Sequence, residues 1–191
     1  MSEIETRVAA LEGHVRRFWA GHIVESATWD RGPVRERLPY FSSYRVLPVK
    51  AGGAWVYVTV GSSVDSSVEG SGTEFFLMSP WADPVHSETL AMVGHFNSFE
   101  AHRLGVGSTV RLGRPWMEDS LMDHLLVSLP YPYGPNLEWA PSEAGCAQFL
   151  WLLPIHKSES DFVRNEGLEA FEEILDRAHV NFLEVDRSPV V

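Results

Sequence analysis

The sequence predicts an α+β fold in which helices flank a mixed, mostly antiparallel sheet. Amphipathic helical patterns occur near both ends of the chain, and β-branched and aromatic runs are grouped between them. Hairpin-like turns join most of these runs, whereas a regular alternation of strands and helices would indicate a parallel sheet. The 191 residues and the 45% hydrophobic content suit one domain, with an N-terminal helix within residues 1–21 and a core of residues 22–191.

The first element is an amphipathic helix over residues 2–20. Ser2 and Glu5 match a capping box, and Gly21 stands where a C-terminal cap belongs. Apolar residues spaced by three or four positions form its expected inner face: Ile4, Val8, Leu11, Val15 and Phe18.

Residues 22–43 are expected to connect this helix to the sheet with one short element, because their RGP and LPY segments break regular structure. Two strands follow in YRVLPV (44–49) and AWVYVTV (54–60), with a tight turn at AGG (51–53). Side chains alternate along a strand. The odd-numbered residues of the second strand should therefore face one side of the sheet and its even-numbered valines the other.

The Gly- and Ser-rich segment 61–72 is expected to form a hairpin loop before the strand TEFFLMS (73–79), with a ligand-contacting loop as the alternative. The dipeptide Asp83-Pro84 is typical of a helix start, and this helix should end before Gly105. Its expected inner face consists of Leu90, Val93, Phe96, Ala101 and Leu104.

Three further strands are expected, at residues 108–113, 123–130 and 146–153. The last of them is apolar on both faces, which favours a central place in the sheet. Ser158 and Asp161 predict the start of a final helix that reaches Ala178, and an extended tail should follow it.

The charge of the chain disfavours nucleic acid as a direct partner. Lys and Arg number 15 and Asp and Glu number 26, which gives a formal net charge of −11. No apolar run approaches the ~18 residues of a membrane-spanning helix, and the charged N-terminal segment lacks the apolar stretch of a signal peptide. The single cysteine, Cys146, cannot form an internal disulfide, so a cytoplasmic location is expected.

No cofactor or metal is expected. The sequence carries no Walker loop, dinucleotide fingerprint, zinc-protease motif or nucleophile elbow. Three histidines lie within or near one expected helix, but His86, His95 and His102 are spaced nine and seven residues apart. Ligands of one ion on a helix are normally four residues apart, so surface or capping roles are favoured for these side chains.

Asp123, His124 and Ser128 are the residue types of a hydrolase triad. Neighbouring strand residues point to opposite faces, which disfavours a relay from Asp123 through His124 to Ser128 and favours a structural pair. A small hydrolase or ligand-binding enzyme that uses Asp123 and His124 is the alternative functional hypothesis.

Aromatic residues are concentrated between Trp116 and the LPYPYGP segment, which contains Tyr131 and Tyr133. Prolines that make this turn rigid could serve folding alone, with the tyrosines covering a sheet edge. Rigid, exposed aromatics would also anchor a protein partner at little entropic cost.

Several segments, in this order, resemble the suppressor-of-fused family and specifically its single-domain bacterial members. These segments are WVYVTVG (55–61), TEFFLMSP (73–80), GSTVRLGRPW (107–116), DHLLVSLPYPYGP (123–135), FLWLLPI (149–155) and GLEAFEE (167–173). The resemblance implies a fold similar to the N-terminal domain of the animal protein, which binds zinc-finger transcription factors of the Hedgehog pathway. It implies binding and not catalysis.

The resemblance also implies which residues contact a ligand. The animal protein holds its partner's peptide between two domains, partly by strand addition, and this chain lacks the length of the second domain. Phe96 matches an aromatic residue that faces the ligand, and Ser108 stands where the family presents an acid. The expected binding residues are these two by resemblance, together with Trp116, Tyr131 and Tyr133 as exposed aromatics.

The leading hypothesis is thus a non-enzymatic, protein-binding domain that uses no cofactor. Bacterial relatives are thought to include immunity proteins that neutralise toxins, and an acidic chain suits a basic toxin domain as its partner. A regulatory protein is the other partner class. A purely self-associating structural protein is a third hypothesis.

Overall fold

The computed structural model describes residues 2–29, 31–64, 72–140 and 146–191. The strands are β1 (Val24–Ser26), β2 (Ser42–Val46), β3 (Trp55–Val60), β4 (Gly72–Ser79), β5 (Thr109–Arg111), β6 (His124–Ser128), β7 (Trp139–Ala140) and β8 (Ala147–Ile155). The α-helices are α1 (Glu3–Phe18), α2 (Val34–Arg37), α3 (Val85–Asn97), α4 (Pro135–Glu138), α5 (Lys157–Glu166) and α6 (Leu168–Ala178). A short 3-10 helix, η1 (Glu100–His102), follows α3.

The strands form a mixed sheet in the order β1-β2-β3-β4-β8-β6-β5, with β7 paired to the beginning of β8. Among the described pairs, β4 and β8 run parallel and the other pairs are antiparallel. This confirms the predicted α+β class with a mostly antiparallel sheet. The predicted central place of β8 is also confirmed, since β4 pairs along one side of it and β6 along the other.

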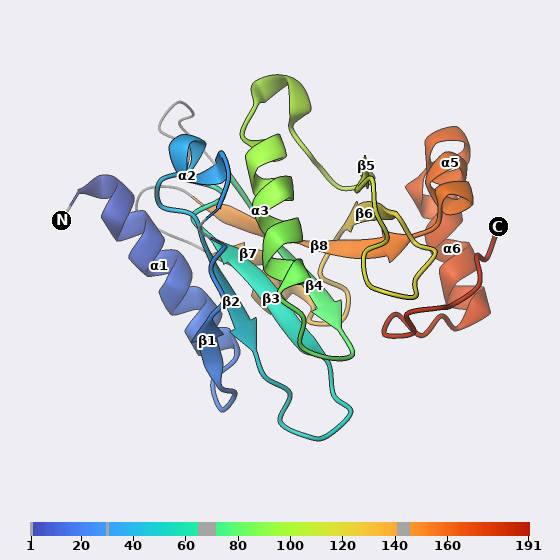
Figure 1. Ribbon diagram of the computed structural model, residues 1–191, viewed down its shortest axis with the longest axis horizontal. Helices are drawn as coiled ribbons and strands as arrows, with labels where there is room; N and C mark the ends of the chain where they lie inside the picture. The colour runs from blue at the N-terminus through green and yellow to red at the C-terminus, as the bar shows by residue number, and fades with distance from the viewer. Residues whose placement is uncertain (1, 30, 65–71, 141–145) are drawn as a thin grey trace.

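Both faces of the sheet are buried, as Figure 1 shows from the side where α3 crosses in front of β3 and β4. One face, which we call the α1 face, packs against α1, α4, α5 and α6. The opposite face, the α3 face, packs against α2, α3 and the segment between β5 and β6. In β3, Val56, Val58 and Val60 belong to the first core and Tyr57 to the second, which confirms the predicted alternation.

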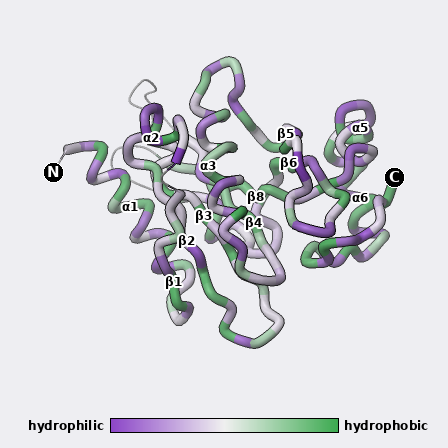
Figure 2. The backbone as a smooth tube through the Cα atoms, in the orientation of Figure 1, coloured by the Kyte–Doolittle hydropathy of each residue, from purple (hydrophilic) through white to green (hydrophobic). Residues whose placement is uncertain are grey.

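Helix α1 confirms the first predicted helix. The Ser2 side chain accepts a hydrogen bond from the Glu5 backbone, and the Glu5 carboxylate accepts one from the Ser2 backbone. Figure 2 shows hydrophobic and hydrophilic residues alternating along this helix. Leu11 and Val15 are buried against the sheet, and the helix ends at Phe18 rather than at Ala20.

The predicted helix from Asp83 to Leu104 is wrong at its C-terminal end. Helix α3 stops at Asn97, whose buried side chain accepts a hydrogen bond from the Leu104 backbone at 2.8 Å. This bond folds the chain back on itself, so Ala101 lies in η1 and Leu104 follows it. Phe96 does not lie on the inner face either, because its side chain is exposed.

The predicted final helix is two helices. Gly167 has a φ of +94°, a conformation that favours glycine, and it separates α5 from α6. The helix starts after His156, because the Glu159 carboxylate accepts the His156 backbone N–H at 2.8 Å. Asp161 does not form the predicted cap and instead pairs with Lys157.

The C-terminal tail is fixed by an ion pair that the sequence pattern does not reveal. The Arg187 guanidinium contacts both carboxylate oxygens of Glu159, at 2.6 and 2.7 Å, and donates to the Pro154 carbonyl at 3.2 Å. Burial alone would raise the pKa of Glu159, but the hydrogen bonds from Arg187 and nearby backbone groups lower it. The prediction of an extended tail is wrong, because the chain turns at residues 182–183 and 185–186, where the Glu184 backbone N–H donates to the Asn181 carbonyl at 3.1 Å, and no part of the tail forms a described strand.

The segment 22–43 contains two short elements, β1 and α2, before β2 begins, where one element was expected. Most of the predicted loop 61–72 lies outside the described residues, and so does its ligand-contacting alternative. The described start of the loop is held by Glu74, whose carboxylate accepts backbone hydrogen bonds from Gly61 and Ser63 at 3.0 and 2.9 Å. No helix in the described part of the chain is long and apolar enough to cross a membrane.

Candidate functional site

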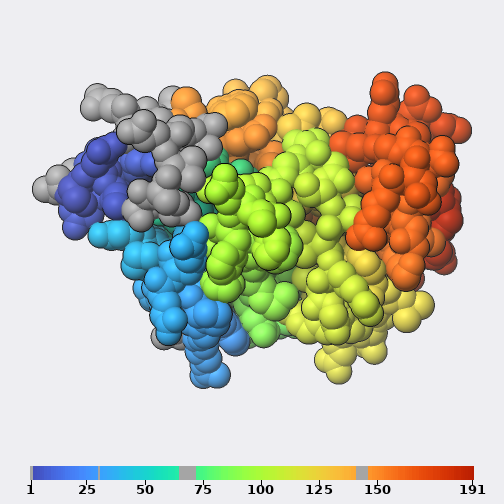
Figure 3. All heavy atoms as spheres, turned by 90° about the horizontal axis from the view of Figure 1, so that it is seen from above, coloured from blue at the N-terminus to red at the C-terminus, as the bar shows by residue number. Residues whose placement is uncertain are grey.

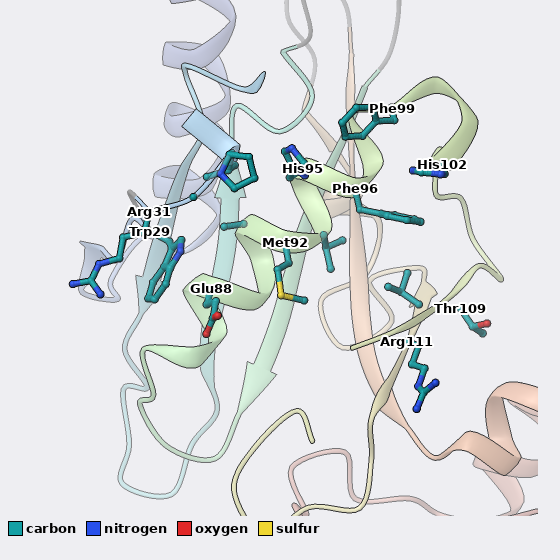
Figure 4. Close-up of a pocket in the computed structure, with 16 residues that line it drawn as sticks. Trp29, Arg31, Glu88, Met92, His95, Phe96, Phe99, His102, Thr109 and Arg111 are labelled. Atoms are coloured by element: carbon teal, nitrogen blue, oxygen red, sulfur yellow. The ribbon is translucent and has the colours of Figure 1, made fainter. Parts of the chain in front are cut away.

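A groove of about 730 Å³ lies on the outer surface of the α3 face. Helix α3 forms its floor, Trp29 together with residues 31–34 forms one wall, and β5 forms the other. Figure 3 shows these segments next to one another at the molecular surface, and Figure 4 shows their side chains around α3.

The floor of the groove is a second apolar face of α3. Met92, Phe96 and Phe99 are 38%, 38% and 40% exposed and follow one another at spacings of four and three residues. Residues at these spacings share one side of a helix and the turn after it, and this side points away from the buried Leu90 and Val93. A helix that is apolar on both sides, with one side uncovered, is typical of a binding surface.

Aromatic contacts hold this floor in place. The Phe96 ring is stacked on the His102 ring, with centroids 4.4 Å apart and planes 4° from parallel. The Phe99 ring meets His95 edge to face at 5.2 Å, and the guanidinium of Arg37 lies 5.1 Å from the Phe99 ring centre. Side chains ordered before binding lose less conformational entropy when a partner arrives.

The wall formed by β5 is a sheet edge, since β5 pairs with β6 and with no other described strand. The Ser108 carbonyl accepts the Val127 backbone N–H, and the Leu112 N–H donates to the Asp123 carbonyl. The alternation of an antiparallel pair therefore also turns the Val110 backbone groups toward β6. The backbone groups of Thr109 and Arg111 therefore point to the open edge. An extended peptide can pair with such an edge.

Of the predicted binding residues, Phe96 lines the groove and Ser108 directly precedes the β5 wall. The Ser108 side chain is used within the turn, where its Oγ accepts the Gly105 backbone N–H at 3.1 Å. The groove also contains residues that the sequence analysis did not select, Trp29 and Met92 among them. The apolar spacing of Met92, Phe96 and Phe99 was the available signal, but the sequence analysis considered only Phe96 of these three and assigned it to the buried face of the helix.

The expectation of an exposed aromatic is wrong for Trp116. This side chain is only 2% exposed and packs within the core of the α3 face, because the segment between β5 and β6 folds back over the sheet. Its ring lies 5.6 Å from that of His86, another buried residue.

Tyr131 and Tyr133 have different environments although they are two residues apart. Tyr133 is half-buried and meets the rings of Phe18, Trp19 and Phe76, and this burial raises its pKa to about 12. Tyr131 is 59% exposed and donates a hydrogen bond to Glu172 of α6 at 3.3 Å. Neither tyrosine lines the groove, so the structure does not bring the five predicted residues together.

The candidate hydrolase residues form a pair but no triad. Asp123 precedes β6 and is not restrained by strand alternation, so its Oδ1 lies 2.6 Å from Nδ1 of the buried His124. Ser128 is four residues further along the strand, about 13 Å away along an extended backbone. The imidazole of His124 cannot reach this hydroxyl, and neither residue lines the groove.

The histidines of α3 and η1 do not form a metal site. His86 is buried, and its Nε2 lies 2.9 Å from the Ser79 hydroxyl, whereas His95 and His102 belong to the aromatic floor of the groove. No group of three or more His, Cys, Asp or Glu residues in the described ranges is arranged to hold a metal ion.

The mixed sheet with both faces covered is the α+β fold that the resemblance to the suppressor-of-fused family implied, and sequence comparison agrees. The model of the suppressor of fused protein (SUFU) family matches residues 39–188. The chain belongs to the suppressor of fused family. No curated protein sequence matches it significantly.

Solved structures extend this result. The chain is similar to a suppressor of fused homolog from Neisseria gonorrhoeae, with 36% identity, a TM-score of 0.85 and 97% coverage of both chains. It shares its fold with a chain of the Sufu–Fu complex at 14% identity and a TM-score of 0.72, over 97% of this chain and 92% of that one. The Drosophila suppressor of fused matches at 15% identity and a TM-score of 0.71, and 97% of this chain covers 51% of the Drosophila chain.

Proposed function

We propose that this protein is a non-enzymatic binding domain that holds a segment of a partner protein in the groove over α3. The observation that carries the proposal is the exposed, pre-ordered apolar floor made by Met92, Phe96 and Phe99. A member of the same fold has been crystallised as part of the Sufu–Fu complex, which supports protein binding as the activity of this chain.

The edge of β5 supplies the second part of the proposed site. A partner segment in extended conformation would pair with the outward backbone groups of Thr109 and Arg111 and place a side chain over Phe96. Backbone pairing would give affinity without sequence preference, and the floor would select the apolar side chain.

This proposal is tested by affinity capture from cells that express the chain. The tagged wild-type protein should retain a partner in stoichiometric amount, and Phe96→Ser should lose it. Leu121→Ser is a matched control, because Leu121 is 82% exposed and lies outside the groove. Equal capture by wild type and Phe96→Ser would contradict a binding role for the groove.

We further propose that binding serves to inhibit the partner in the cytoplasm, as an immunity protein inhibits a toxin. The net charge of −11 supports this role, because an acidic protein associates rapidly with a basic toxin domain. Tyr131 stands among Glu138, Glu172 and Asp176, an aromatic residue on an acidic surface that suits such a partner.

The inhibitory role has its own test. A captured partner is expressed in bacterial cells with and without this chain, and growth is measured. Wild type should restore growth, while Tyr131→Lys should restore less of it. A partner that is harmless when expressed alone would contradict the immunity role and leave the binding role in place.

A further inference from the structure

We infer that the groove over α3 selects an acidic segment, in which carboxylates flank an apolar residue. This inference rests on the proposed function, because it specifies the partner of the same groove. It is carried by the charges on the groove walls, which are opposite in sign to the charge of the whole chain.

Among the described residues that line the groove, the charged side chains are Arg31, Arg111 and Glu88. The lining thus has two permanent cations and one anion, whereas the whole chain has 15 basic and 26 acidic residues. Glu88 is itself paired with Arg114, whose guanidinium lies 3.7 Å from its carboxylate. A partner that enters the groove therefore meets a positive site on an acidic protein.

The two arginines stand on opposite walls. In Figure 4, Arg31 lies beside Trp29 on one side of α3, and Arg111 lies on β5 at the other side, with Met92 and Phe96 between them. A segment that crosses the floor would meet a cation, an apolar surface and a second cation in turn. Carboxylates on both sides of an apolar residue match this sequence of contacts.

Both guanidinium groups are placed to contact a partner. The Arg111 side chain is 73% exposed, and its nearest described anion, Asp123, is 4.0 Å away and already lies 2.6 Å from His124. The Arg31 guanidinium lies 5.7 Å from the Trp29 ring centre, a contact that orients the side chain without neutralising its charge. Arginine can then bind a carboxylate through two parallel hydrogen bonds.

A basic ligand fits the groove less well. Ser108, which directly precedes the β5 wall, has a neutral hydroxyl that is used by the Gly105 backbone. Glu88 is the single acid among the lining residues that the structure describes, and Arg114 offsets its charge. No described carboxylate of the lining is therefore available to pair with a lysine or arginine of the partner.

Single-stranded nucleic acid is the other polyanion that aromatic rings and arginines can bind. Such a strand needs a row of cations along its phosphates, and its affinity grows with the number of phosphates neutralised. Two arginines on opposite walls do not form such a row, and the acidic remainder of the chain would repel the flanking phosphates. These observations favour an acidic peptide.

The test is a selection from a displayed library of random peptides of about twelve residues, with the intact chain as bait. The selected peptides should be enriched in Asp and Glu on both sides of an apolar residue. For a synthetic copy of the strongest binder, Arg31→Glu/Arg111→Glu should raise the Kd at least tenfold, about 1.4 kcal/mol. Raising the salt concentration should also weaken the complex.

A matched double variant controls for total charge. Arg16→Glu/Arg177→Glu makes the same change of charge at exposed sites on α1 and α6, outside the groove, and should change the Kd less than twofold. Thermal midpoints of both double variants should stay close to that of the wild type, which shows that they fold.

The outcomes separate this inference from the proposed function. Peptides that need Phe96 but carry basic residues, or show no enrichment in acids, would overturn the inference and leave a peptide-binding groove in place. Failure to select any peptide whose binding depends on Phe96 would overturn both. Binding of a single-stranded oligothymidine that depends on Arg31 and Arg111 would overturn the inference in favour of nucleic acid.

Discussion

The two faces of the sheet are covered in different ways. On the α1 face, four helices lie over the strands, and the C-terminal tail is tied to them by the buried Glu159–Arg187 pair. On the α3 face, the main cover is one helix whose outer side is also apolar and carries Phe96 at the surface. The first face is closed by contacts within the chain, and the second presents a surface that the chain itself leaves uncovered.

This difference indicates how stability and binding are distributed. The buried Glu159–Arg187 pair of the α1 face is satisfied inside the molecule, so changes there should act on the free energy of unfolding. Side chains on the outer side of α3 are partly exposed and contribute less to the buried core, so changes there should act mainly on partner binding. Four predictions test this division, in order of expected effect.

The largest effect is expected on the α1 face. Arg187→Ala would leave the buried Glu159 carboxylate without its cation, which should lower the free energy of unfolding by about 3–5 kcal/mol. Urea denaturation measures this loss. A Glu159→Leu/Arg187→Leu variant should be less destabilised than Arg187→Ala, because it buries no unpaired charge. Wild-type stability of Arg187→Ala would contradict the role of this pair.

The second prediction concerns pH and the core beneath α3. Burial lowers the pKa of His86 from 6.5 to about 4. Between these values the unfolded chain binds more protons than the folded chain, so stability falls as the pH drops from 6.5 to 4. Over this range the free energy of unfolding should fall by about 3 kcal/mol because of His86. His86→Gln should flatten this part of the curve of urea midpoint against pH.

Wild type and His86→Gln are compared at the same pH values. The effect of carboxylate titration on stability is common to both proteins and cancels in this comparison. The Ser79 hydroxyl donates to the Trp81 carbonyl at 2.7 Å and accepts from Nε2 of His86, which fits a neutral imidazole. Parallel curves for the two proteins would show that His86 does not cause the acid sensitivity.

The third prediction contrasts two tyrosines. Tyr133→Ala should lower the free energy of unfolding by about 2–3 kcal/mol, because the ring loses its contacts with Phe18, Trp19 and Phe76. Truncating a fully buried aromatic would cost more, since the Tyr133 ring is only half-buried. Tyr131→Ala should stay within about 0.5 kcal/mol of the wild type, because its ring is exposed. Thermal unfolding of the two variants checks this contrast, and equal losses would contradict it.

The smallest effect on stability is expected at the groove. Phe96→Ser should change the free energy of unfolding by about 0.5 kcal/mol or less, while it abolishes capture of the partner. Leu90→Ala on the buried side of the same helix is the comparison and should cost about 2–5 kcal/mol. If Phe96→Ser proved as destabilising as Leu90→Ala, the floor of the groove would belong to the core.

Part of the site could be read from the sequence. Phe96 and Ser108 were selected by family resemblance, and the structure places Phe96 in the groove and Ser108 beside it. Trp116 was selected because rigid aromatics near prolines suit the binding of a partner, but the fold buries it. Arg31 and Arg111 gave no pattern of their own, since 80 residues separate them and only the packing of α3 between them makes one groove.

Features that depend on neighbours along the chain could be predicted from the sequence. The capping box of α1, the alternation in β3 and the apolar run of β8 each follow from spacing within a few residues, because backbone geometry sets those periods. Long-range packing, in contrast, sets which apolar side of α3 is covered, which tyrosine is exposed and which cation reaches Glu159. These outcomes depend on contacts between residues far apart in the sequence, and local spacing carries no information about which distant surfaces meet.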